Sequence, residues 1–268
     1  IFGSAVNVKL SGIKVSFAQD VKAQFNSGNV GVFLDSVKGA SVIDDCHVAA
    51  NIAVSGEKIA SVAAFAGSVD GDNSVITNSG ANVTVKYEDE KTDDEKVFDT
   101  VSGFIGSIDG ENVNVSNCYV TGSVFAGKYA FIGKATGEKL TAENIIWSKG
   151  GEKAAQNPVD FENAVFDEEQ FSTWSFDISE GAFFTGKGGK FVAELPEIKV
   201  LLNASADDFT VSCNTDEIVS SVSISDGKLI LNVERADGSV TVRNSPVTVT
   251  NTTTGLSLSI KVSNGLDR

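Results

Sequence analysis

Acidic side chains recur beside glycine at matching places in the first half of the chain. Asp70 and Asp109 directly precede a glycine, and Asp72 and Glu111 directly follow one. Two carboxylates about 5 Å apart can serve as the acid and the nucleophile of a retaining glycosidase. Carboxylates from neighbouring segments can also bind Ca²⁺, which prefers oxygen ligands. Ordinary turn chemistry is the third interpretation, because Asp-Gly and Gly-Asp are common turn dipeptides.

The single histidine, His47, has no nucleophile close to it in the sequence. Its neighbour Cys46 would point to the opposite face of a strand, and the zinc-protease helix requires two histidines. The cysteines Cys46, Cys118 and Cys213 lie far apart, which is typical neither of a disulfide framework nor of a zinc site. We therefore predict no catalytic residue and no cofactor, with calcium at the four carboxylates as the one candidate.

Three aromatic side chains are candidates for binding a sugar. Tyr119, Tyr129 and Trp147 each combine an apolar ring face with a polar group. Tyr119 follows an Asn-Cys pair at which the chain is expected to bend, so an outward direction fits it. Packing in the core or at its rim is the alternative for all three.

These residues belong to a repeat of about 30 residues. In each copy a glycine follows a phenylalanine by six residues, and an asparagine or aspartate follows that phenylalanine by twelve or thirteen. The four copies are marked by Phe33, Phe65, Phe104 and Phe131. Repeats of this length indicate stacked units, none of which can bury its apolar face alone.

Short alternating strands separated by glycine turns predict a parallel β-solenoid over residues 31–149. We expect the four phenylalanines to stack inside it. We expect the shared asparagines to occupy left-handed bends and to form an amide ladder. Residues 1–30 are expected to add short strands at 6–17, around a Ser-Gly turn, and at 19–26. The shared glycines are expected to adopt left-handed turns: Gly39, Gly71, Gly110 and Gly137.

The remaining segments differ in composition. The acidic stretch 87–96 is expected to leave the stack as a solvated loop. Residues 150–197 contain many large aromatic side chains without a regular period, and we predict that they cap the stack. The first domain would then span 1–197. Residues 198–268 show six or seven alternating runs with Asp-Gly turns, which predicts a small antiparallel β-sandwich.

The net charge of −15 narrows the range of partners. Nucleic acid is excluded as an expected partner because phosphate binding requires a basic face. The chain has no run of 18 apolar residues, so we expect no membrane insertion. We expect a monomer. The chain contains no Met and opens inside an ordered pattern, which favours a fragment of a longer product.

The third copy resembles the GLUG repeat of bacterial surface proteins. The resemblance rests on Phe104-Ile105-Gly106, on residues 116–124 and on residues 129–133, and it extends over about 31–149. The Gly-Gly-Leu-Val-Gly run of that family is eroded here, and the first copy has Asp35 in place of the closing glycine. Residues 200–268 resemble a bacterial immunoglobulin-like domain through their strands and turns.

The GLUG resemblance implies a right-handed parallel β-helix in a secreted or wall-attached protein. We therefore expect a non-catalytic fragment of a bacterial cell-surface or extracellular protein. It would act in adhesion or as a rigid spacer, with a glycan or an extracellular protein as its ligand. One alternative is a carbohydrate-active β-helix enzyme, a lyase or a hydrolase, that uses the stacked carboxylates. A purely structural wall component is the other.

Overall fold

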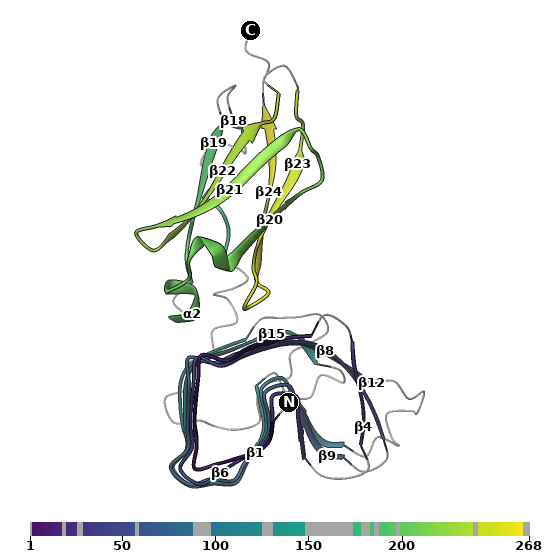
Figure 1. The fold of residues 1–268 in the computed structure, drawn as a ribbon, viewed down its shortest axis with the longest axis vertical. Coiled ribbons are helices and arrows are strands. Elements are labelled where there is room, and N and C mark those ends of the chain that lie inside the picture. The colour runs from purple at the N-terminus through teal and green to yellow at the C-terminus, as the bar shows by residue number, and fades with distance from the viewer. Residues whose placement is uncertain are drawn as a thin grey trace. The chain divides into compact units, whose positions relative to one another are not determined.

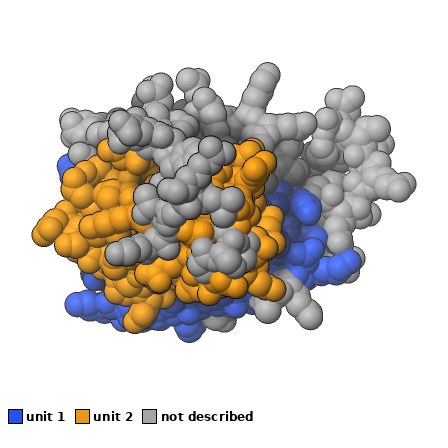
Figure 2. Space-filling model, turned by 90° about the horizontal axis from the view of Figure 1, so that it is seen from above, with its two compact units in different colours: residues 1–172 blue, residues 173–268 orange. Residues whose placement is uncertain are grey.

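The computed structural model describes residues 2–17, 20–25, 29–56, 59–87, 98–124, 131–147, 174–177, 183–184, 188–196, 199–237 and 241–264. The chain forms two compact units, residues 1–172 and residues 173–268 (Figure 2). The described residues are mostly β-strand, and their helices are the short α2 (Lys199–Leu202) and the 3-10 helix η3 (Ala206–Asp208). The predicted all-β class is confirmed. No helix in the described ranges is long and apolar enough to span a membrane.

The first unit contains three sheets, and all of their described strand pairs are parallel (Figure 1). Sheet one has the order β1 (Phe2–Val6), β6 (Leu34–Lys38), β10 (Ala66–Val69), β14 (Ile105–Ile108) and β16 (Ile132–Ala135). Sheet two has the order β2 (Lys9–Ser11), β7 (Val42–Asp44), β11 (Val75–Thr77), β15 (Asn114–Val124), β12 (Gly80–Tyr87), β8 (His47–Gly56) and β3 (Lys14–Ser16). In addition, β4 (Val21–Phe25) pairs with β8 and β17 (Thr141–Trp147) with β15. Sheet three has the order β13 (Phe98–Ser102), β9 (Ile59–Ala63) and β5 (Asn29–Gly31).

The shared phenylalanines form one continuous column. The register of sheet one aligns the residue after each phenylalanine with its counterpart in the neighbouring copy. The ring centroids of Phe33 and Phe65 are 5.0 Å apart, those of Phe65 and Phe104 4.4 Å, and those of Phe104 and Phe131 4.7 Å. All four rings are fully buried. The predicted phenylalanine stack is confirmed, at roughly the strand spacing of a sheet.

The described residues up to Phe25 add one more layer to the same sheets. Strands β1, β2, β3 and β4 pair in parallel with β6, β7 and β8 of the first predicted copy. The expected bend at Ser11-Gly12 is present, with a φ of 71° at Gly12. Phe2 contacts Phe33 edge to face at 5.5 Å instead of stacking on it. The parallel array therefore begins before residue 31, where the sequence repeat first becomes visible.

The shared glycines serve a different purpose from the one predicted. Only Gly39 has a left-handed backbone, with a φ of 62°. A Cβ on Gly71 would lie 2.2 Å from the carbonyl oxygen of Gly39, and one on Gly110 would lie 2.6 Å from that of Gly71. At Gly71, Gly110 and Gly137, the prediction of a left-handed turn is wrong. Glycine is needed there because the backbones of neighbouring copies approach too closely for a side chain.

In the first three copies the left-handed bends lie at the shared aspartate or asparagine, as predicted. Asp45, Asn78 and Asn117 have φ values of 52°, 51° and 52°. The amide of Asn117 donates to the side-chain oxygen of Asn78 at 3.3 Å, and the amide of Asn78 donates to Asp44 at 2.7 Å. Asn tolerates this conformation, and its amide joins one copy to the next. The predicted amide ladder is present between the second and third copies, and it ends on the carboxylate of Asp44 in the first copy.

The second unit contains two sheets. One has the order β19 (Gly189–Glu194), β22 (Lys228–Arg235) and β21 (Ile218–Ser225), with antiparallel pairs throughout. The other has the order β18 (Phe183–Phe184), β24 (Ser257–Asn264), β23 (Ser245–Asn251) and β20 (Phe209–Cys213). Its pairs are antiparallel except that between β18 and β24.

Most of the predicted runs in the second unit are strands, with one exception. The Asp226-Gly227 turn joins β21 to β22 with φ values of 53° and 72°, which is the left-handed pair that a two-residue hairpin requires. Residues 241–243 belong to the alternating run Ser239-Val240-Thr241-Val242-Arg243 of the sequence, but they are not in a strand. Val242 is instead held by Asn264, whose side-chain oxygen accepts its amide at 2.7 Å.

The described part of the aromatic segment 150–197 does not belong to the first unit, as it was predicted to. Strands β18 and β19, which fall within the predicted cap at 150–197, pair with β24 and β22 of the second unit. Phe184 on β18 and Phe191 on β19 are buried there. Strand β19 alternates inward apolar residues with Lys190 and Glu194 on its outer side. The units divide between residues 172 and 173, earlier than the predicted boundary at 197. The acidic stretch after Tyr87 and residues 148–173 lie outside the described ranges.

Candidate functional site

The four predicted calcium ligands lie on neighbouring copies. The register places Val69 beside Ile108, which sets Asp70 beside Asp109 and Asp72 beside Glu111. This stacking agrees with the alignment of the repeat.

One contact of these carboxylates lies within a single copy, and two join neighbouring copies. The hydroxyl of Ser68 donates to Asp70 at 3.1 Å, and the hydroxyl of Thr136 donates to Asp109. The backbone amide of Glu111 donates to Asp72 at 2.8 Å. Three or more His, Cys, Asp or Glu side chains do not gather into a metal-binding group anywhere in the described part of the chain. Calcium binding here stays a prediction, and the observed contacts are one local hydrogen bond and two hydrogen bonds between neighbouring copies.

The three candidate sugar-binding aromatic residues differ in burial and in how far the structure describes them. Tyr119 is fully buried, so its ring offers no open face to a sugar. Trp147 lies on β17, where its backbone pairs with Val120, and its side chain is outside the described part of the structure. Tyr129 also lies outside the described residues.

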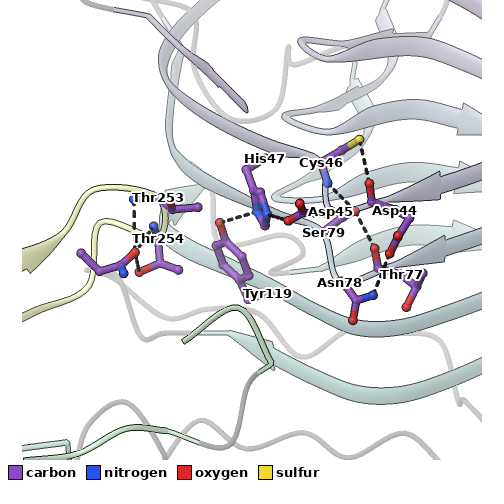
Figure 3. A network of polar contacts seen from close by, with 11 residues as sticks. Asp44, Asp45, Cys46, His47, Thr77, Asn78, Ser79, Tyr119, Thr253 and Thr254 are labelled. Carbon is purple, nitrogen blue, oxygen red and sulfur yellow. Dashed lines mark hydrogen bonds and ion pairs between the residues drawn. The ribbon is translucent and has the colours of Figure 1, made fainter. Parts of the chain in front are cut away.

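The structure brings together three polar side chains that are not assigned to one site by the sequence. The hydroxyl of Tyr119 lies 3.1 Å from Nδ1 of His47, and Nε2 of His47 lies 2.9 Å from Oδ1 of Asp45 (Figure 3). The two rings are nearly parallel, with centroids 5.8 Å apart. His47 is buried, whereas the Asp45 side chain is 52% exposed. We call these three residues the Tyr-His-Asp cluster.

Glycine makes this cluster possible. The register places Gly80 between His47 on one side and Tyr119 on the other. A Cβ on Gly80 would lie 2.2 Å from the Tyr119 ring. The tyrosine ring therefore occupies the space above the glycine and reaches the histidine two copies away. His47 and Tyr119 lie on the face of the sheet opposite to Cys46 and Cys118, because side chains alternate along a strand.

Burial determines the charge state of the cluster. Desolvation lowers the pKa of His47, although the hydrogen bond to Asp45 opposes this shift and Lys14 reinforces it. Burial also raises the pKa of the Tyr119 hydroxyl. A neutral His47 donates from Nε2 to the Asp45 carboxylate and accepts the Tyr119 proton at Nδ1. A phenol with a raised pKa is a poor nucleophile at neutral pH, so the geometry fits a structural clamp.

The sequence did contain a signal for this cluster. Aligned on the bend residues Asp45, Asn78 and Asn117, the residues two positions later are His47, Gly80 and Tyr119. A histidine and a tyrosine separated by one glycine layer are within reach of each other in a parallel stack. The chain neighbours of His47 alone do not reveal this contact.

Two cysteines and one serine also occupy equivalent positions in successive copies. Cys46, Ser79 and Cys118 stack in successive copies, and each donates to a backbone carbonyl two residues earlier, at 3.4, 2.8 and 3.2 Å. Ser79 separates the two cysteines, and both are free. Burial raises the pKa of Cys46, and raises that of Cys118 to about 12. Both thiols are therefore protonated and unreactive at neutral pH.

Comparisons of the chain with models of known protein families, with curated proteins and with solved structures find no match. The resemblances to a GLUG repeat and to an immunoglobulin-like domain accordingly stay predictions.

Proposed function

We propose that the first unit is a right-handed parallel β-helix of the GLUG kind and that the second is an immunoglobulin-like sandwich. The supporting observation is that equivalent residues of successive copies pair in parallel and in register over four layers. The phenylalanine column and the asparagine ladder repeat with the same period. A stack of this kind is stiff along its axis because each layer is bonded to the next through its backbone.

The proposed role is non-catalytic. In this proposal the chain is part of a bacterial cell-surface or secreted protein. It acts in adhesion or as a rigid spacer, and its ligand is a glycan or an extracellular protein. The same in-register stacking carries this proposal, since regular repetition gives length and stiffness without a specialised cleft. The polar contacts fit structural roles. Tyr119, His47 and Asp45 form a clamp, and Asp72 and Asp109 each accept a hydrogen bond from a neighbouring copy.

The alternative is a carbohydrate-active enzyme of the same architecture. It is favoured by one observation, the placement of Asp70 and Asp109 on neighbouring layers, since a retaining glycosidase holds its two carboxylates about 5 Å apart. In this alternative one of the two would carry the catalytic proton and the other would act as the nucleophile.

A paired binding and activity experiment separates the two proposals. The chain would be applied to a glycan array and to immobilised extracellular matrix proteins. In parallel it would be incubated with neutral and polyuronic polysaccharides while reducing ends are measured. The spacer or adhesin proposal predicts no release of reducing ends above background. The enzyme proposal predicts release of reducing ends that is abolished by Asp109→Asn and unchanged by Asp207→Asn. That result would overturn the spacer or adhesin proposal.

A further inference from the structure

Among the described residues of the second unit, β21 is the longest edge strand. It forms one end of the β19-β22-β21 sheet and has eight residues. The other edge strands among the described residues of this unit are β19, with six residues, β20, with five, and β18, with two. An unpaired edge presents a row of backbone donors and acceptors to any extended chain that approaches it.

The turn geometry identifies which backbone groups are free to pair. In a hairpin closed by a two-residue turn, the residues flanking the turn exchange both hydrogen bonds, and every second pair does so from there. Ser225 pairs with Lys228 across this turn, so the groups that face away from β22 belong to every second residue before it. They are the N–H and C=O groups of Ile218, Ser220, Val222 and Ile224.

Strand β21 lacks the usual features that prevent edge pairing. Its sequence, IVSSVSIS, has no charge, no proline and no glycine, and its register with β22 is unbroken by a bulge. Val219 is 57% exposed. The opposite edge strand, β19, carries Lys190 and Glu194, and Val192 is bridged to Asp177. Natural proteins commonly protect an open edge with charge, proline or a covering segment. Of these two strands only β19 carries charges of its own, and β21 lies close to β20 and η3 without pairing with either in the described part of the chain.

We propose that β21 is a docking edge for an extended strand of another protein, which would extend the three-stranded sheet by one strand. The charges around β21 define the partner. Asp216 and Glu217 precede the strand, Asp226 follows it, and all three are exposed. Lys228, opposite Ser225, is engaged by Glu194 at 2.5 Å. Acidic flanks favour an uncharged strand with basic residues at its ends, and the net charge of −15 disfavours a second copy of this chain.

The partner strand should also have a particular side-chain pattern. Val222 and Ile224 are only half-buried on the core side of β21. β-branched or aromatic residues at alternate positions of an added strand would cover them, because side chains of paired strands on one face are neighbours. The recognition mode is strand addition, in which backbone bonds supply affinity and alternate side chains supply specificity.

The test uses the full chain and a synthetic ten-residue peptide of alternating Val and Thr with Lys at both ends, blocked at its termini. Binding would be measured by fluorescence anisotropy at low and high salt. We expect Ser220→Pro to weaken binding about tenfold or more, since it removes an outward N–H. Ser220→Ala keeps that N–H and should bind within about twofold of the unmodified chain. Replacing the peptide lysines with glutamate should abolish binding at low salt.

A second measurement guards against misfolding of the proline variant. Peptides methylated on alternate backbone nitrogens probe the same edge without altering the protein, and only one of the two methylation patterns should prevent binding. Equal binding of both methylated peptides, or no binding of the unmethylated peptide at millimolar concentration, would overturn the proposal. A dimer in sedimentation that Ser220→Pro disrupts would also overturn it, because the edge would then belong to a second copy.

Discussion

The two units of this chain keep their strands in register by different means. In the first unit, equivalent residues of successive copies pair with each other, so Phe33, Phe65 and Phe104 meet like with like. In the second unit, antiparallel pairing brings unlike residues together, and the Asp226-Gly227 turn sets the register. A parallel stack therefore concentrates one interaction into a column, whereas an antiparallel sheet distributes many different pairs. The columns should be the sensitive points of the molecule.

The phenylalanine column should show the largest effect. Phe104 is fully buried, with neighbouring rings at 4.4 and 4.7 Å. We expect Phe104→Ala to lower the free energy of unfolding of the first unit by about 3–5 kcal/mol, because it leaves a cavity between two rings. Phe2→Ala, at the edge-to-face end of the column, should cost much less because Phe2 is 39% exposed.

The two tryptophans allow this measurement to be made unit by unit. Trp147 lies in the first unit and Trp174 in the second, where its indole N–H donates to the carbonyl of Glu194 at 2.8 Å. Denaturant unfolding followed in Trp147→Phe and Trp174→Phe backgrounds reports each unit separately. Phe104→Ala should move only the transition reported by Trp147. A shift of both transitions by the same amount would mean that the two units do not unfold independently.

Glycine substitutions should give the second largest difference in stability cost between the two units. A Cβ on Gly110 would lie 2.6 Å from the carbonyl oxygen of Gly71, a backbone atom that cannot move alone. At Gly227 nothing lies within 4 Å of an added Cβ, and only its φ of 72° opposes a side chain. We expect Gly110→Ala to destabilise the first unit by about 2–3 kcal/mol and Gly227→Ala to destabilise the second by about 1 kcal/mol. Thermal unfolding of the two variants would measure the difference. Equal costs would mean that the stacked backbones separate to accept the methyl group.

These glycines also show where sequence reasoning stops. A left-handed φ and a close backbone approach both select glycine, so the shared Gly71 and Gly110 could not be assigned to either from the sequence. Phe65 and Phe104 could be predicted to stack, because a parallel repeat maps equal positions onto each other. Phe184 and Phe191 could not be assigned, since an aromatic segment without a period fits either a cap or a strand. The His47–Tyr119 contact was predictable in principle, but only by aligning the bends across copies.

Polar columns should contribute less than apolar ones. Asn78 joins two neighbouring copies, because its amide donates to Asp44 at 2.7 Å and its oxygen accepts from Asn117 at 3.3 Å. We expect Asn78→Ala to cost about 1–2 kcal/mol, through two lost hydrogen bonds and a left-handed φ of 51° that alanine resists. The matched change in the second unit is Thr248→Ala, which removes an exposed bond to Ser259 and should cost about 0.2–1 kcal/mol. Urea titration of both variants would test the order, and a larger cost for Thr248→Ala would refute it.

The smallest effect should be a dependence of stability on pH in the first unit alone. His47 is the only histidine, and burial lowers its pKa in the folded chain below the ordinary value of about 6.5. The unfolded chain therefore binds a proton at a higher pH than the folded chain does. It follows that the free energy of unfolding should fall as the pH drops below about 6.5, and that it should level off below the folded pKa of His47.

A variant separates the contribution of His47 to the pH dependence of stability from that of the carboxylates. His47→Gln removes the titrating group while keeping a side chain that can hydrogen-bond to Tyr119 and Asp45. The difference in stability between the parent and His47→Gln should shrink from pH 8 toward pH 5.5 in the transition reported by Trp147, and it should stay constant in that reported by Trp174. Tyr119→Phe should retain the pH dependence, because desolvation is the principal cause of the shift. A difference that grows as the pH falls would instead mean that Asp45 dominates and that the folded chain carries His47 as a cation.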